Sequence, residues 1–165
     1  MKKILLTRHA KSSWKDMSLS DRERPLNKRG KRDAPEMGQR LVQRGIQLDL
    51  IISSPAKRAI KTATKLAKEV GYTKKIMREE NLYDASEWHI LEVIRSLDSK
   101  FDKVMLVAHN PGLTDLVNQI SGRRLDNVPT CGIVELDYNI ETWEEVGESK
   151  PEAFLFDYPK KARGI

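Results

Sequence analysis

The sequence predicts an α/β fold, a three-layer α/β/α sandwich with a mostly parallel central sheet. Three observations support this prediction. Short apolar runs alternate with longer stretches in which apolar residues recur at helical spacing. The apolar runs end in polar residues, as expected where a buried strand opens into a loop. Only the last third of the chain is rich in strand-like segments without helices between them. Repeated strand–helix units place helices on both faces of a parallel sheet.

The first half of the chain contains two strand–helix units. Residues 3–7 (KILLT) form a compact apolar run that predicts a buried strand. Residues 27–44 carry apolar side chains at helical spacing and are followed by a glycine suited to ending a helix. Residues 48–53 predict a second strand. Residues 55–71 begin with proline, end with glycine and carry an amphipathic stripe, which predicts a second helix.

The second half continues this order and then becomes strand-rich. Residues 75–78 predict a short strand, and Ser86 is the expected N-cap of a helix with its apolar stripe over residues 90–97. Residues 103–108 (KVMLVA) are the strongest strand signal, and residues 113–122 predict a further helix. Three later segments are expected to be strands: 132–139, 142–149 and 153–158.

Composition limits the class of protein. The length of 165 residues is that of one domain, here expected to span 1–165, and 39% hydrophobic with 33% charged residues is typical of a globular protein. The net charge of +6 comes from basic and acidic residues that are interspersed, which argues against a nucleic-acid partner. No apolar run is long enough for a membrane span or a secretory signal. Residues 158–165 are basic and are expected to be a frayed, solubilising end.

Cysteine content points to a cytoplasmic location. Cys131 is the only cysteine, so no intramolecular disulfide can form. We expect it to be a small core residue. His89 has no partner at a metal-binding spacing, and we expect neither a metal nor another cofactor.

Candidate functional residues follow three of the predicted strands. Arg8 and His9 come directly after the first strand, Arg58 lies one turn into the helix after the second, and His109 follows the strand 103–108. The carboxyl ends of parallel strands meet at one edge of a sheet, so these four side chains are expected to share a site.

Two arginines and two histidines suit phosphoryl transfer. A guanidinium offers forked donors that match phosphate oxygens. His9 is the candidate nucleophile, and its ring needs a partner, such as a backbone carbonyl, that fixes the neutral tautomer. Arg8, Arg58 and His109 would bind and neutralise the phosphoryl oxygens.

The motifs LLTRHAKS, SSPAKRAIKTA and VAHNPG, in this order, resemble the histidine phosphatase superfamily, and this resemblance implies a phosphoglycerate-mutase-like fold. Ala10 stands where the glycine after the Arg-His pair is usual, and with RPLNKRG and LYDAS it makes the chain similar to the small SixA-type phosphohistidine phosphatases. The resemblance covers residues 2–136. It implies that His9 becomes phosphorylated, and that the substrate is a phosphorylated protein carrying phosphohistidine.

Family members that act on phosphate esters add a carboxylic acid that protonates the leaving group. Asp84 is the best positional match, ahead of Glu80 and Glu87. Arg24 either reaches the phosphate or braces its loop. Two alternatives therefore remain: a phosphatase of small phosphate esters or anhydrides with Asp84 as acid, and a non-catalytic phosphate- or nucleic-acid-binding module.

Overall fold

The computed structural model describes residues 1–161, and a six-stranded sheet lies at its centre. The strand order is β3-β2-β4-β1-β5-β6. The strands are β1 (Lys2–Arg8), β2 (Leu50–Ser53), β3 (Met77–Arg78), β4 (Lys103–Ala108), β5 (Ile133–Tyr138) and β6 (Ala153–Asp157). The helices are α1 (Lys28–Gln43), α2 (Lys57–Val70), α3 (Glu87–Arg95) and α4 (Gly112–Ser121).

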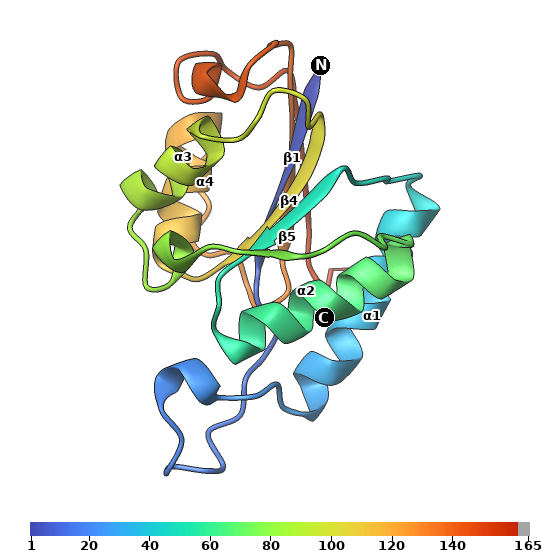
Figure 1. Cartoon of the computed structure of the whole chain (residues 1–165), viewed down its shortest axis with the longest axis vertical. Helices are drawn as coiled ribbons and strands as arrows, with labels where there is room; N and C mark the ends of the chain where they lie inside the picture. Colours follow the sequence, from blue (N-terminus) through green and yellow to red (C-terminus); the bar gives the residue numbers. More distant parts are fainter. Residues whose placement is uncertain (162–165) are drawn as a thin grey trace.

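Helices cover both faces of this sheet, which makes the three-layer α/β/α sandwich that the sequence predicts. Figure 1 shows α1 and α2 together on one side and α3 and α4 on the other. Alternate residues of β1 pack on opposite faces of the sheet. Leu5 packs in the core under α1 and α2, whereas Ile4 and Leu6 pack in the core under α3 and α4. This alternation follows from the two-residue period of a strand.

The register of the strands brings three strand ends to one level. β1 pairs with β4 in parallel so that Arg8 lies opposite Ala108, and Ser53 at the end of β2 lies opposite Val107. The chain leaves β1 toward α1 on one face and leaves β4 toward α4 on the other. The crevice between two strands whose connections diverge in this way is where open α/β sheets bind ligands.

Most predicted elements are confirmed, with boundaries shifted by one or two residues. The strand predicted over residues 103–108 matches β4 in full, and Ser86 caps α3 as expected by accepting from the backbone of His89. The segment 75–78 contributes only Met77–Arg78 to the sheet.

The prediction of a strand over residues 142–149 is wrong. Residues Trp143–Glu145 form a 3₁₀ helix instead. Its Thr142 and Glu145 form a capping box, in which the glutamate side chain accepts from the backbone N–H of Thr142 at 3.1 Å. Trp143 is buried in the core, so one large side chain holds the turn in place.

Two expectations concern membrane spans and the C-terminal residues. None of the helices within residues 1–161 is both long enough and apolar enough to cross a membrane. The expectation of a frayed basic end over residues 158–165 falls in part on residues 162–165, which lie outside the described residues.

Candidate active site

Arg8, His9, Arg58 and His109 line one pocket of about 210 Å³ at the carboxyl ends of β1, β2 and β4. We call it the histidine pocket. The ring centroids of His9 and His109 are 5.1 Å apart. The remaining lining residues are Lys11, Ser12, Trp14, Arg24, Asn110 and Thr130. The structure therefore brings together all four residues that the strand-end argument selected.

A backbone carbonyl determines the tautomer of His9. Its Nδ1 lies 2.8 Å from the carbonyl oxygen of Ala10, which can only accept, so Nδ1 carries the proton and Nε2 keeps a free lone pair. Burial lowers the pKa of His9 to about 3, and the nearby His109 and Arg58 add to this effect. The ring is consequently neutral at pH 7 and has a nucleophilic nitrogen.

Ser54, directly after β2, orients His109. Nε2 of His109 lies 2.7 Å from Oγ of Ser54, which also accepts a hydrogen bond from the backbone N–H of Ala56. Burial lowers the pKa of His109 to about 4, with the positive charge of Arg58 as the second cause. Nδ1 of His109 and Nε of Arg8 are buried and make no hydrogen bond within residues 1–161.

Asp21 holds Arg58 from one side. The Arg58 guanidinium donates to the Asp21 carbonyl oxygen at 2.6 Å and to the Asp21 carboxylate at 2.9 Å. Tyr83 donates its hydroxyl to the same carboxylate at 2.6 Å, and this bond is the largest cause of a lowered pKa of Asp21. A guanidinium carries five N–H donors, so three remain for an anion once these two bonds within residues 1–161 are made.

Arg24 braces the loop between β1 and α1 and also lines the histidine pocket. It donates to the carbonyl oxygen of Ser13 at 3.2 Å, to the carboxylate of Asp21 at 3.0 Å and to the hydroxyl of Ser12. Its guanidinium lies 3.2 Å from the centroid of the exposed Trp14 ring. The two roles considered for Arg24 are thus compatible in this structure.

The histidine pocket is basic, whereas the space beside it also contains carboxylates. Among the described residues that line the pocket, four are cations and none is a carboxylate. A neighbouring hollow of about 350 Å³ shares Arg58, His109 and Asn110 with the pocket and adds Asp21, Tyr83 and Asp84. We call it the side hollow. Asp84 is exposed and adopts a left-handed backbone conformation with φ of 51°.

Buried contacts from α2 and from the turn before β5 hold the loop that carries His9. The backbone N–H of Ala10 donates to Oγ1 of Thr62 at 2.9 Å, and this hydroxyl donates to the Arg58 carbonyl at 2.8 Å. The backbone N–H of Cys131 lies 3.0 Å from the His9 carbonyl oxygen. Thr62 therefore links the loop of His9 to the helix turn of Arg58.

Cys131 and Ser13 have structural roles. Cys131 is buried, as expected. Ser13 accepts from the backbone N–H of Lys15, a bond that caps the loop. Across residues 1–161, no three His, Cys, Asp or Glu side chains are grouped so that they could hold a metal ion.

Sequence reasoning missed Asp21, Ser54, Thr62 and Tyr83. Thr62 stands four residues after Arg58 and could have been found as a polar residue on the buried face of α2. Ser54 directly follows β2, just as His9 directly follows β1, so its position at a strand end was a signal for it. Asp21 carries no local signal, because its partners Arg58 and Tyr83 are 37 and 62 residues away.

The sequence was compared with families of known proteins. The sequence model of the histidine phosphatase superfamily (branch 1) matches residues 4–92. An uncharacterized chloroplast protein of Arabidopsis thaliana is 31% identical over 153 residues, covering 87% of this chain and 70% of the relative. An uncharacterized protein of Mycobacterium tuberculosis is 30% identical over 139 residues, covering 78% of this chain and 85% of the relative.

Solved structures with similar folds include SixA proteins. A structure from Agrobacterium tumefaciens named for phosphohistidine phosphatase SixA is 26% identical, covers 93% of this chain and 97% of its own, and superposes with a TM-score of 0.79. The protein histidine phosphatase SixA complexed with tungstate is 16% identical and superposes with a TM-score of 0.82 over 97% of this chain and 99% of its own.

Proposed function

We propose that this chain, which belongs to the histidine phosphatase superfamily, dephosphorylates protein phosphohistidine through a covalent intermediate on His9. Membership of the superfamily supports phosphatase activity. The observation that carries the catalytic proposal is the pairing of a neutral His9, its Nδ1 held by the Ala10 carbonyl, with the cations of the histidine pocket.

In the first step, Nε2 of His9 attacks phosphorus. A bond forms between Nε2 and phosphorus while the bond from phosphorus to the substrate nitrogen breaks, and the electron pair leaves with the substrate imidazole. Arg8 and Arg58 neutralise the equatorial oxygens as charge builds up on them. If Ser54 donates its hydroxyl proton to Nε2 of His109, Nδ1 of that ring carries a proton and is a further donor for the phosphoryl group.

In the second step, water attacks phosphorus and breaks the bond to His9. The products are inorganic phosphate and the neutral ring, with the Ala10 carbonyl still holding Nδ1. Residues of this chain alone supply the charges in both steps, so the proposed reaction needs no metal.

The side hollow supports phosphohistidine as the substrate. Of its two carboxylates, Asp21 is already bonded to Arg58 and Arg24, whereas Asp84 is exposed beside the histidine pocket. Carboxylates favour a protonated imidazole, which is a good leaving group and a hydrogen-bond donor, over an anionic leaving group. The exposed apolar residues Trp14, Met17 and Leu19 on the loop before α1 suit contact with a protein.

The second candidate is a phosphatase of small esters or anhydrides that uses Asp84 as acid. The position of Asp84 in the side hollow favours it, because a carboxylic acid there could protonate a leaving oxygen. Asp84→Asn discriminates between the two. A large loss on esters with little loss on a phosphohistidine peptide would assign Asp84 to poor leaving groups only.

The decisive experiment measures phosphate release from a phosphohistidine peptide and from a phosphate monoester, with chelator present. The variants are His9→Ala and, as a matched control, His89→Ala on the exposed face of α3. We expect release from the phosphohistidine peptide that His9→Ala abolishes and His89→Ala preserves. Release that survives His9→Ala, or that requires an added metal ion, would refute the mechanism.

A further inference from the structure

A groove lined by four lysines lies beside the histidine pocket. It has a volume of about 330 Å³. Its lining residues are Pro25, Leu26, Lys31, Lys57, Lys61 and Lys65. Leu26 is buried and Pro25 is half-buried, so the apolar residues form its base, and we call it the lysine groove.

The positive charges of this groove are not neutralised within residues 1–161. Lys57, Lys61 and Lys65 are spaced by four residues and therefore lie on the same face of α2. Neither they nor Lys31 make an ion pair with any residue of the described part of the chain. Like charges four residues apart destabilise a helix, and an acidic surface laid across them would remove the repulsion.

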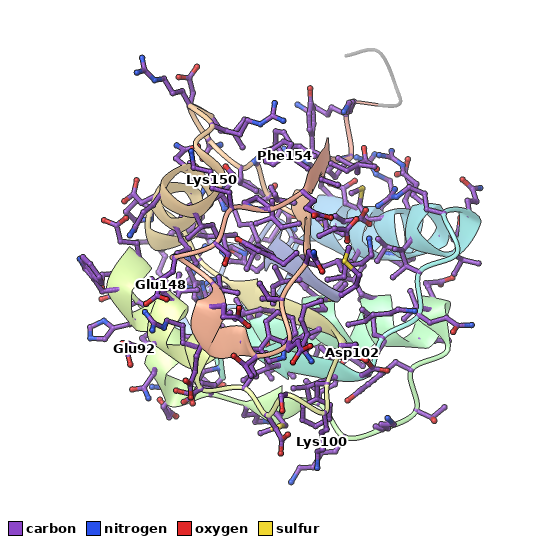
Figure 2. The ribbon with its side chains drawn as sticks, turned by 90° about the horizontal axis from the view of Figure 1, so that it is seen from above. Glu92, Lys100, Asp102, Glu148, Lys150 and Phe154 are labelled. Carbon is purple, nitrogen blue, oxygen red and sulfur yellow. The ribbon has the colours of Figure 1, made fainter. Side chains whose placement is uncertain are left out.

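Charges at the opposite end of the molecule are mixed. Figure 2 views the molecule from that end, where Lys100 and Lys150 lie among the acidic residues Glu92, Asp102 and Glu148. A general excess of lysine on the surface therefore does not account for the lysine groove.

The lysine groove adjoins the histidine pocket through paired backbone segments. The backbone N–H of Ser13 donates to the Pro25 carbonyl at 2.8 Å, and Ser12 pairs with Leu26. Ser12 lines the histidine pocket, whereas Pro25 and Leu26 line the lysine groove. A partner bound in the groove would thus lie one short segment away from the pocket.

We infer that the lysine groove binds an acidic segment of the phosphorylated protein and so directs its phosphohistidine into the histidine pocket. This inference rests on the proposed function. A protein partner is favoured over a nucleic acid because none of the described residues that line the groove is aromatic and could stack on a base. Electrostatic complementarity of this kind acts chiefly on the rate of encounter and on the choice of partner.

The test compares two phosphohistidine peptides, one flanked by glutamates and one by glutamines. The variant is Lys61→Gln/Lys65→Gln, and the matched control is Lys100→Gln/Lys150→Gln. At low ionic strength we expect the groove variant to raise KM for the glutamate peptide about tenfold. The glutamine peptide, the small substrate phosphoramidate and the control variant should all stay within about twofold of wild type, because exposed charges outside the contact contribute little.

A second measurement keeps docking separate from catalysis. Fluorescence anisotropy of labelled, unphosphorylated peptides measures binding without any reaction. If the phosphohistidine peptides release no phosphate, the proposed function fails, but the docking inference can still be tested by this binding. Preference for the glutamate peptide that the groove variant abolishes supports the inference. Equal binding of the two peptides overturns the inference. It is also overturned if a single-stranded oligodeoxynucleotide binds more tightly than the glutamate peptide and the groove variant abolishes that binding.

Discussion

Replacing Thr62 by valine should weaken the loop of His9 while leaving the shape of the core unchanged. Valine is close to threonine in shape but lacks the hydroxyl that accepts from the backbone N–H of Ala10 at 2.9 Å. Thr62 is fully buried, so water cannot replace this bond. A buried N–H without a partner costs about 1–3 kcal/mol. For a chain of this length that corresponds to a fall in Tm of about 2–12 °C.

The same substitution should also reduce catalysis. Ala10 donates through its N–H to Thr62 and accepts through its carbonyl from Nδ1 of His9, so a mobile Ala10 peptide leaves the nucleophilic ring free to turn. We expect kcat on a phosphohistidine peptide to fall about tenfold or more, because small misplacements of a reacting group are expensive. The assays are thermal unfolding and phosphate release.

Thr64→Val is the matched control. Thr64 lies on the same helix and its hydroxyl also donates to the carbonyl four residues earlier, at 2.8 Å, but its side chain is exposed and bonds to no other segment of residues 1–161. Its change in stability should stay within about 0.5 kcal/mol. If Thr62→Val and Thr64→Val were equally stable and equally active, the bond to Ala10 would not hold the loop.

Three further outcomes are expected. The unfolded chain binds protons at His9 and His109 near pH 6.5, whereas the folded chain does so only near the lowered pKa values of about 3 and about 4. The free energy of unfolding should therefore fall by about 2 kcal/mol per histidine from pH 7 to pH 5, and urea titrations should show His9→Asn losing that share of the fall. Ser54→Ala removes the hydrogen bond to His109, so kcat should fall about tenfold with KM changing less. An unchanged kcat would show that Ser54 does not support catalysis. Burial raises the pKa of the Cys131 thiol, so a thiol reagent at pH 8 should modify it only as fast as the protein opens, and rapid modification of the folded protein would contradict its burial.

The sequence was a good guide to features encoded by neighbouring residues. The strand over residues 103–108 is an uninterrupted apolar run, and Gly71 and Gly122 end α2 and α4 in the left-handed conformation that glycine adopts without strain. The prediction of a strand over residues 142–149 was wrong although the segment contains a local signal for a helical turn, the Thr-x-x-Glu capping box. Tryptophan and valine in that segment favoured a strand, and burial of the tryptophan side chain decided otherwise.

The sequence by itself determined which residues end or closely follow the parallel strands, and hence that Arg8, His9, Arg58 and His109 would meet, because parallel strand ends share one edge of a sheet. Only the tertiary structure decided how those side chains are held. The bonds from Arg58 to Asp21, from Ala10 to Thr62 and from His109 to Ser54 join residues 37, 52 and 55 positions apart. Such pairs depend on the paths of loops, which have no periodicity in the sequence, and on the packing that removes water from between the segments.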